Sequence, residues 1–197
     1  MDNKTIDYYN QNADSFIQGT VSVDFKETQD KFLMLLAGKK VLDFGCGSGR
    51  DTKYFLNAGL DVVAIDGSEE LCKSASAYTG IHVKHMLFQE LDEVDCYDGI
   101  WACSSILHLT KDELRIVMNK MSRAIKPNGI IYTSFKYGNF EGERNGRYFT
   151  DFTLEAFKDF AKDVKEIAIE EYWITGDVRT GREEEKWLNL ILRKITS

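Results

Sequence analysis

Short apolar runs alternate along the chain with segments in which apolar residues recur at helical spacing. The runs at 41–44, 61–65, 81–86, 97–103 and 130–135 have the length of buried strands, and two more strands are predicted at 165–174 and 185–195. Strands that alternate with helices indicate right-handed crossovers and a doubly wound sheet. The pattern predicts an α/β fold with a seven-stranded, mostly parallel sheet and an antiparallel strand near the C-terminus.

Helix boundaries are marked by local signals. Two amphipathic helices are predicted ahead of the first strand, over 5–19 and 24–37. Thr110 and Glu113 form a capping box that predicts a helix start at residue 111, and the only proline, Pro127, is expected to lie in the turn that ends this helix. The segment 136–150 is polar, glycine-rich and long for a connection, so we expect it to form a lid over a substrate.

Composition narrows the class of partner. The 197 residues are 43% hydrophobic and 29% charged, which suits one globular domain over residues 1–197. Nucleic-acid affinity depends on Lys and Arg, so a net charge of −7 favours a small-molecule substrate and no nucleic acid. No apolar stretch is long enough for a membrane span, and the polar start of the chain has no leader, so we expect a cytoplasmic protein without a membrane partner. Either a monomer or a homodimer fits.

The four cysteines do not form a metal or disulfide pattern. Cys46, Cys72, Cys96 and Cys103 are scattered and have no histidines at zinc-finger spacing. We therefore expect reduced thiols and no metal site. Cys46 lies between two glycines at a helix start, where a thiol is either a small packing residue or has a lowered pKa.

The first strand leads into a turn with three glycines in five residues, Gly45, Gly47 and Gly49. Such a turn lets the backbone approach a ligand closely, and the N–H groups of the following helix point into the same space. Arg50 stands where the dinucleotide fingerprint has its third glycine, which argues against NAD. Asp43 precedes the turn, where a carboxylate would repel a pyrophosphate and hold an amino group. The expected ligand has an amino-acid head.

The stretch 41–52 resembles motif I of class I S-adenosylmethionine-dependent methyltransferases, and the resemblance covers almost the whole chain. It implies a Rossmann-like sheet, S-adenosylmethionine as cofactor, and N-terminal helices within 1–37 that cover it. The chain is similar to stand-alone bacterial enzymes sometimes labelled tellurite-resistance-type, a label that identifies no acceptor. Tyr9 and Phe16 match a family segment that lies across the cofactor, with core packing as the alternative role.

Asp66 ends the second strand, where doubly wound sheets place the acid that accepts the ribose hydroxyls. Its alternative role is a turn residue before the helix cap Ser68. After the third strand the chain departs from the family pattern, because Leu87 and Phe88 stand where an acid usually reads adenine. The expected cofactor contacts are Tyr9, Phe16, Asp43, Gly45, Cys46, Gly47, Ser48, Gly49, Arg50, Asp51, Asp66, Gly67, Ser68, Phe88, Gln89, Glu90, Cys103, Ser104 and His108.

Methyl transfer from a sulfonium is a one-step displacement that depends mainly on orientation, so the family needs no fixed catalytic triad. If the acceptor must lose a proton, His108 is the best candidate base, because it follows the fourth strand and an imidazole ordinarily titrates near neutrality. A capping or packing role is the alternative. Two polar segments, 136–150 and the loop 176–182, contain five candidates for binding a carboxylate or phosphate on the acceptor: Lys136, Arg147, Tyr148, Arg179 and Arg182.

The resemblance therefore implies an S-adenosylmethionine-dependent methyltransferase that acts on a small molecule. A non-catalytic S-adenosylmethionine-binding sensor or partner subunit is the alternative, since a cofactor cradle alone does not require an acceptor site. Surface solvation is the alternative role for the basic residues, and an exposed hairpin is the alternative for loop 176–182.

Overall fold

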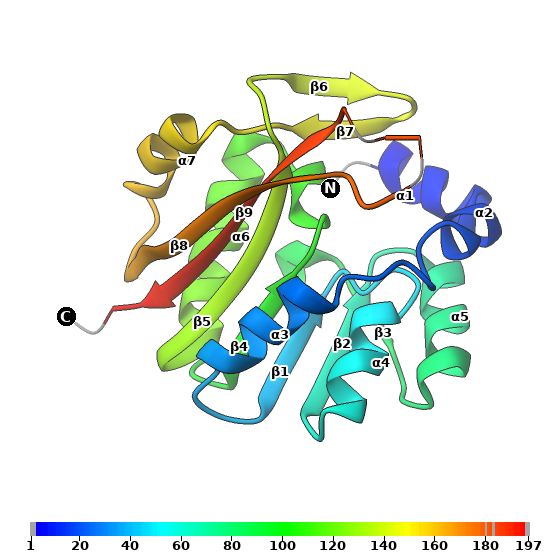
Figure 1. The fold of residues 1–197 in the computed structure, drawn as a ribbon, viewed down its shortest axis with the longest axis horizontal. Helices are drawn as coiled ribbons and strands as arrows, with labels where there is room; N and C mark the ends of the chain where they lie inside the picture. The colour runs from blue at the N-terminus through cyan, green and yellow to red at the C-terminus, as the bar shows by residue number, and fades with distance from the viewer. Residues whose placement is uncertain (1–2, 180, 183, 196–197) are drawn as a thin grey trace.

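The computed structural model describes residues 3–179, 181–182 and 184–195. A seven-stranded sheet with the order β3-β2-β1-β4-β5-β9-β8 crosses the molecule (Figure 1). Neighbouring strands from β3 to β5 pair in parallel, and β9 runs antiparallel to both β5 and β8. The predicted fold class is confirmed. The strands are β1 (Lys40–Phe44), β2 (Asp61–Asp66), β3 (Lys84–His85), β4 (Tyr97–Ala102), β5 (Ile125–Lys136), β8 (Ile167–Gly176) and β9 (Lys186–Lys194).

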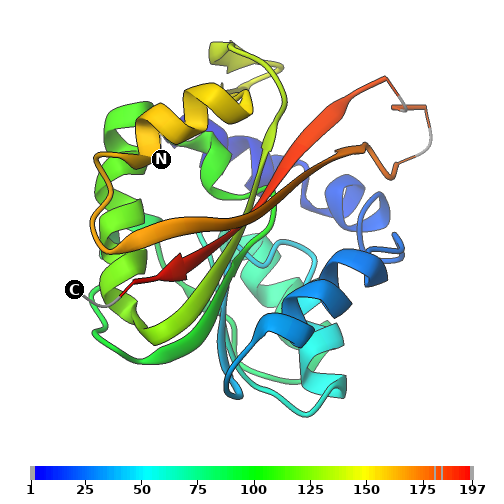
Figure 2. The ribbon, with the colours of Figure 1, turned by 60° about the vertical axis from the view of Figure 1, so that its left-hand side comes forward.

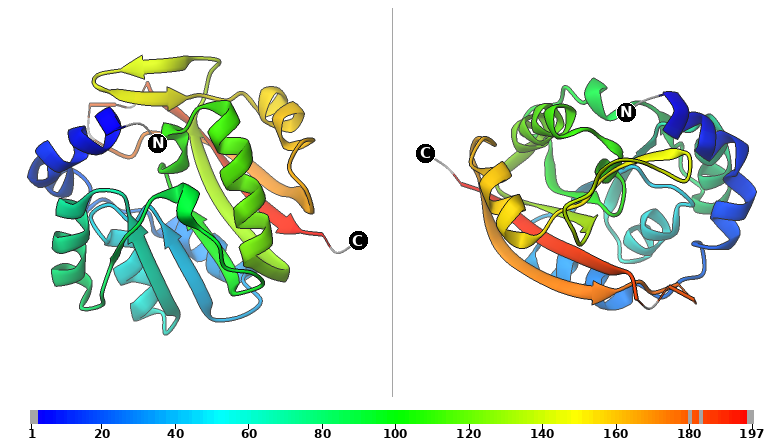
Figure 3. Two further views of the ribbon diagram at one scale, coloured as in Figure 1. Left: turned by 180° about the vertical axis from the view of Figure 1, so that it is seen from behind. Right: turned by 90° about the horizontal axis from the view of Figure 1, so that it is seen from above.

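Alternate side chains of the central strands enter two different cores. Leu42 and Phe44 of β1 pack on one face with α6 (Lys111–Ala124) and α7 (Leu154–Ala161). Val41 points to the other face, where α3 (Lys26–Leu35) and α4 (Arg50–Asn57) contribute Phe32 and Phe55. Figures 2 and 3 show the sheet between these two helical layers. Both faces are covered, which explains why the parallel strands read as continuous apolar runs.

The helix predictions hold in outline and differ in detail. The segment predicted as one helix over 5–19 is two helices, α1 (Asn3–Gln11) and α2 (Ala13–Gln18), that break at Asn12. The Asn12 side-chain amide donates to the Tyr8 carbonyl at 2.8 Å and so competes with the helical backbone bonds. Thr110 and Glu113 form the predicted capping box at the start of α6. Ser68 caps α5 (Glu69–Thr79) by accepting a bond from the Leu71 amide.

Two strand predictions are inaccurate. The third strand covers only Lys84–His85 instead of 81–86, because β3 is an edge strand that pairs with just the last two residues of β2. The fifth strand begins at Ile125, directly after α6, instead of at Ile130. The Pro127 turn lies within this strand as an irregularity, with Asn128 at φ 63°.

The segment predicted as a polar lid is a β-hairpin. β6 (Glu141–Arg144) and β7 (Arg147–Thr150) pair antiparallel across Asn145-Gly146, whose φ values of 52° and 76° give the turn that suits a two-residue hairpin. The hairpin stands above the end of β5 and close to α1 (Figure 1). Short 3₁₀ segments at Phe88–Glu90 and Ile106–His108 complete the described elements. Among the described residues, no helix has the length and apolar character needed to cross a membrane.

Candidate functional site

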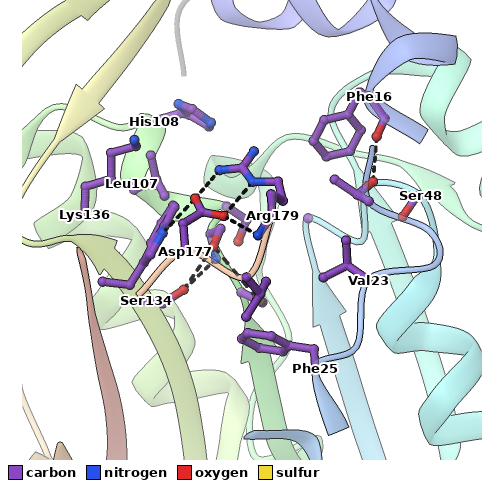
Figure 4. Close-up of a pocket in the computed structure, with 18 of the residues that line it drawn as sticks. Phe16, Val23, Phe25, Ser48, Leu107, His108, Ser134, Lys136, Asp177 and Arg179 are labelled. Carbon is purple, nitrogen blue, oxygen red and sulfur yellow. Dashed lines mark hydrogen bonds and ion pairs between the residues drawn. The ribbon is translucent and has the colours of Figure 1, made fainter. Parts of the chain in front are cut away.

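A cavity of about 420 Å³ lies at the carboxyl ends of β1, β2, β4 and β5. This is the edge where open parallel sheets place their ligands, and the volume suits a small molecule. Because β9 is antiparallel to β5, Lys136 pairs with Trp187 at the same edge, so the β8–β9 connection also reaches the cavity. Figure 4 shows Asp177 and Arg179 of this connection between His108 and Lys136 on one side and Phe16 and Ser48 on the other.

The glycine turn forms one wall of the cavity. Gly45, Gly47 and Gly49 have φ values of 90°, 54° and 80°, in the region that L side chains rarely adopt. A Cβ at Gly45 would lie 2.5 Å from Ser105 Cβ, so the first glycine is also required for space. Phe16 of α2 covers Gly47, where an added Cβ would lie 3.0 Å from the Phe16 ring. The turn thus packs against Ser105 on one side and is covered by Phe16 on the other.

Asp66 lies at the end of β2 and lines the cavity. Its Oδ2 accepts a hydrogen bond from the Gly47 amide at 2.9 Å, and its Oδ1 accepts one from the Ser68 amide at 2.8 Å. Burial raises the pKa of Asp66, although these backbone donors act in the opposite direction. The carboxylate is therefore held in one orientation beside the glycine turn, with capacity for further donors from a ligand.

Asp43 does not have the expected position. It is 2% exposed, does not line the cavity, and its Oδ2 accepts a bond from the Thr52 hydroxyl at 2.5 Å. Strand alternation turns Asp43 toward α4, away from the ligand side. Burial, together with the nearby Asp51, raises the pKa of Asp43 to about 8, which favours its neutral form. Its geometry indicates that Asp43 fixes α4 against β1, outside the cavity where its carboxylate was expected to hold an amino group.

Arg50 and Asp51 form an ion pair at the start of α4, and both residues line the cavity. Asp51 also accepts hydrogen bonds from Gln29 at 2.6 Å and from the Trp101 indole at 2.9 Å. The Arg50 guanidinium lies 4.8 Å from the centre of the Phe25 ring. The arginine that breaks the dinucleotide fingerprint is therefore part of a network that ties α4 to α3 and β4.

Two thiols lie near the turn, Cys46, which is buried, and Cys103, which is half-buried. Burial raises the pKa of Cys46 well above its ordinary value, and that of Cys103 to about 12. Neither thiol has the lowered pKa of a nucleophile. Both side chains line the cavity, so a packing role against a ligand remains open to them.

The region expected to read adenine is only partly in the cavity. Gly67 and Phe88 line it, whereas Gln89 and Glu90 do not. The Gln89 amide nitrogen donates to Glu113, and Glu90 accepts a bond from the Leu87 amide at 2.6 Å. The Gln89 Oε1 is buried without a partner among the described residues. Leu71 of α5 lines this end as well. The adenine end is thus bounded by apolar side chains and backbone.

His108 is 4% exposed and faces the cavity from the segment after β4. Its Nδ1 lies 2.6 Å from the Tyr148 carbonyl oxygen, which only accepts hydrogen bonds, so Nδ1 carries the hydrogen in the neutral ring. Its Nε2 lies 2.9 Å from the Tyr9 hydroxyl. Burial raises the pKa of Tyr9, which keeps the phenol protonated and makes it the donor to Nε2.

Four of the five candidate acceptor-binding residues line the cavity: Lys136, Arg147, Arg179 and Arg182. Tyr148 does not, because its hydroxyl reaches out to Glu141 on the neighbouring strand. Arg179 pairs with Asp177, and the Arg179 guanidinium lowers the pKa of that carboxyl to about 2. Lys136 forms an ion pair with Glu185.

The structure therefore brings together most of the predicted residues. Those that line the cavity are Tyr9, Phe16, Gly45, Cys46, Gly47, Ser48, Arg50, Asp51, Asp66, Gly67, Phe88, Cys103, Ser104, His108, Lys136, Arg147, Arg179 and Arg182. Those that do not are Asp43, Gly49, Ser68, Gln89, Glu90 and Tyr148. The Gly49 position faces α5, where a Cβ would lie 2.9 Å from Thr79, and the Ser68 hydroxyl serves as the α5 cap.

Several lining residues were not predicted. Ser134 lies near the end of β5, and its hydroxyl accepts a hydrogen bond from the Ser104 amide at 2.9 Å. Its place near a strand end was a signal that could have identified it. Val23 and Phe25, in the connection between α2 and α3, carried no such signal. Arg144 and Asn145 enter through the hairpin, whose Asn-Gly turn was visible in the sequence.

Comparison with known proteins agrees with this geometry. Residues 41–129 match a family model described as a methyltransferase domain. Malonyl-(acyl-carrier protein) O-methyltransferase of Salmonella typhimurium is 27% identical over 113 residues, which cover 54% of this chain and 43% of that protein. The aligned part of the chain spans less than half the length of the curated relatives it matches.

Solved structures share the whole fold. Burkholderia thailandensis 1,6-didemethyltoxoflavin-N1-methyltransferase, solved with 1,6-didemethyltoxoflavin and S-adenosylhomocysteine, superposes with a TM-score of 0.76 at 20% identity, covering 97% of this chain and 85% of that one. The cyclase SpnF superposes with a TM-score of 0.72 at 12% identity, covering 97% and 95%. Residues 41–129 are thus similar to a methyltransferase domain, and the sheet order of the whole chain is the fold that these solved structures share.

Proposed function

We propose that the protein is an S-adenosylmethionine-dependent methyltransferase that acts on a small molecule. The observation that carries the proposal is one cavity with a cofactor wall and a proton-accepting wall. Gly45–Gly49 and Asp66 form the first wall, and His108 with Tyr9 forms the second. Since a cyclase shares this fold, the argument depends on these side chains and not on the fold.

The residues present fit the cofactor. Asp66 would accept the ribose hydroxyls, the amides at the start of α4 would face the carboxylate of the methionine end, and Phe88 and Leu71 would enclose the adenine. When bound, S-adenosylmethionine supplies a methyl group on a positively charged sulfur, and the bond from carbon to sulfur breaks as the acceptor's lone pair forms the new bond. Phe16 covers the glycine turn and helps to exclude water.

The acceptor's proton would leave through Tyr9. The Tyr9 hydroxyl takes that proton while it passes its own to Nε2 of His108, and the Tyr148 carbonyl stabilises the imidazolium through Nδ1. A binding module without catalysis has no use for this pair. The segment 136–150, which contains the β6–β7 hairpin, serves as the lid in this proposal, and α1 and α2 cover the cofactor.

Partners and location follow the same reasoning. We expect no nucleic-acid partner because the net charge is −7, and we place the protein in the cytoplasm as a monomer or homodimer. The single domain over residues 1–197 is consistent with the continuous sheet, which draws strands from both halves of the chain.

Calorimetry with S-adenosylhomocysteine tests the cofactor assignment. Asp66→Ala should weaken binding by about 100-fold or more, because charge-assisted bonds to two hydroxyls contribute roughly 1.5–3 kcal/mol each. Asp61→Ala is the matched control: Asp61 is exposed at the opposite end of the same strand, and its loss should leave the affinity unchanged. Melting curves show whether each variant folds. Absence of binding to the native protein, or equal affinity in Asp66→Ala, would contradict the assignment.

Acid should weaken the same interaction. The ribose hydroxyls require the charged carboxylate, and burial raises the pKa of Asp66 above its ordinary value of 3.8. Affinity should therefore be constant at neutral pH and fall as the pH approaches that raised pKa, earlier than for an exposed aspartate. The remaining affinity of Asp66→Ala should lack this fall. Transfer of a labelled methyl group to members of a metabolite panel then separates an enzyme from a binding module.

A further inference from the structure

Among the described residues, the positively charged side chains that line the cavity pair with carboxylates, with one exception. Arg50 pairs with Asp51, Arg144 with Asp151, and Arg179 with Asp177. Lys136 and Arg182 share Glu185. Within the described part of the chain, Arg147 is the one cavity-lining Lys or Arg that forms no ion pair.

The surroundings of Arg147 are aromatic. Its guanidinium carbon lies 4.5 Å from the centre of the Tyr8 ring, 5.2 Å from that of Phe149 and 5.7 Å from that of Tyr9. One Nη donates to the Tyr9 hydroxyl at 3.3 Å. Its Nε is enclosed and has no acceptor among the described residues. Aromatic rings attract a cation, but they neither neutralise it nor accept its in-plane hydrogen bonds.

The nearby carboxylates do not compensate this charge. Glu143, on the strand opposite, pairs with Lys4 at 2.7 Å, and Glu141 pairs with Lys111 at 3.1 Å. A half-buried guanidinium with an unused donor is unfavourable unless an anion reaches it. Each of the other cations that line the cavity lies within ion-pair distance of a carboxylate, and Arg147 differs from them in this respect.

Arg147 also lies next to the proton-accepting pair. The Tyr9 and Phe149 rings that contact Arg147 both contact His108 as well, at centroid distances of 5.5 and 4.8 Å. A single aromatic ring, that of Tyr9 or Phe149, therefore separates a group bound to Arg147 from His108, beside which the acceptor atom would be deprotonated. One small molecule could therefore contact Arg147 with one group and present its reacting atom to Tyr9 and His108.

Resting on the proposed methyltransferase function, we infer that the acceptor carries an anionic oxygen group, a carboxylate or a phosphate, close to the atom that is methylated, and that Arg147 selects for it. The planar guanidinium presents its Nε and Nη donors as a fork that matches two oxygens of such a group. The anion would supply the acceptor that Nε lacks. Arg179 and Arg182 need not take part, since Arg179 pairs with Asp177 and Arg182 lies 3.8 Å from Glu185.

Fragment titration tests the inference without knowledge of the acceptor. Benzoate, phenyl phosphate and the neutral benzamide are titrated by calorimetry into the protein loaded with S-adenosylhomocysteine. We expect one anion to bind at a single site with a Kd of roughly 1–10 mM, as suits fragments of this size, and benzamide to bind at least about tenfold more weakly. Whichever anion binds more tightly identifies the carboxylate or the phosphate.

Variants assign the binding to Arg147. Arg147→Gln should weaken the anion by about 10- to 100-fold, the loss typical of charge-assisted bonds, and Arg147→Lys should restore part of it. Arg123→Gln removes an equal charge from the exposed end of α6 and should have no effect. Affinity for S-adenosylhomocysteine should stay the same in all three variants.

The two proposals fail in different ways. If S-adenosylhomocysteine does not bind, the proposed function fails, and the anion titrations on the unloaded protein still test Arg147. If S-adenosylhomocysteine binds but neither anion does, or if Arg147→Gln binds the anion as tightly as the native protein, the inference on the acceptor is overturned while the cofactor assignment stands.

Discussion

Adding a single methyl group at Gly45 should destabilise the glycine turn and lower the free energy of unfolding. At φ 90°, Gly45→Ala forces an L residue into the left-handed region, and its Cβ would lie 2.5 Å from Ser105 Cβ. Ser105 has little room to move away, because its Cβ is next to the backbone and its hydroxyl donates to the Phe44 carbonyl at 2.6 Å. The substitution thus combines backbone strain with overlap.

The size of the effect can be separated into these parts. The positive φ destabilises the folded state by about 1–2 kcal/mol and overpacking by a further 1–3 kcal/mol or so. Alanine also lowers the conformational entropy of the unfolded chain, which stabilises the protein by roughly 0.4–1 kcal/mol. We expect a net loss of about 2–4 kcal/mol in the free energy of unfolding. Gly59→Ala is the matched control, because Gly59 has a φ of 82° and no atom within 4 Å of an added Cβ. It should lose only about 1 kcal/mol, from the backbone alone.

Urea unfolding followed by tryptophan fluorescence measures both variants, with the midpoint and slope fitted separately. Gly45→Ala should also weaken S-adenosylhomocysteine, because the turn carries the Gly47 amide that orients Asp66. Equal losses of stability in Gly45→Ala and Gly59→Ala would refute the reasoning, since the two differ in space and not in φ.

Two further predictions concern proton transfer and helix capping. His108→Gln and Tyr9→Phe should each lower kcat by about 10²- to 10⁴-fold, as measured by initial rates across pH. Calorimetry should show a nearly unchanged affinity for S-adenosylhomocysteine. A full rate in Tyr9→Phe would exclude proton transfer through the Tyr9 hydroxyl. Thr110→Ala removes the hydroxyl that accepts the Glu113 amide at 3.3 Å and should cost about 1 kcal/mol of unfolding free energy in urea, and an unchanged midpoint would contradict the capping role.

Local signals predicted most of the fold. The apolar runs around Val41 and Ile100 identified strands that are buried on both faces, and the Thr110 capping box marked the start of α6. Prediction was wrong where tertiary pairing decides the outcome. β3 is short because it pairs with only Ile65 and Asp66, and no property of residues 81–83 reveals where that pairing stops.

The site was less predictable than the fold. The positions after strand ends, such as Asp66 and His108, follow from the geometry of parallel sheets and line the cavity as expected. Asp43 lies outside the cavity, because the alternation of side chains along β1 turns it toward Thr52 of α4. The proximity of Arg147 to Tyr9 joins residues 138 positions apart in the chain, and only the folded structure reveals it.

The helix α1 and the β6–β7 hairpin hold each other over the mouth of the cavity. The Tyr148 amide donates to the Thr5 hydroxyl at 3.1 Å, Lys4 pairs with Glu143 at 2.7 Å, and Tyr9 bonds His108, whose Nδ1 bonds Tyr148. The two segments lie far apart in the sequence, and separating them would break these bonds. We therefore expect an opening of this side of the cavity to involve the joint loss of these contacts, which would place product release among the steps that limit turnover.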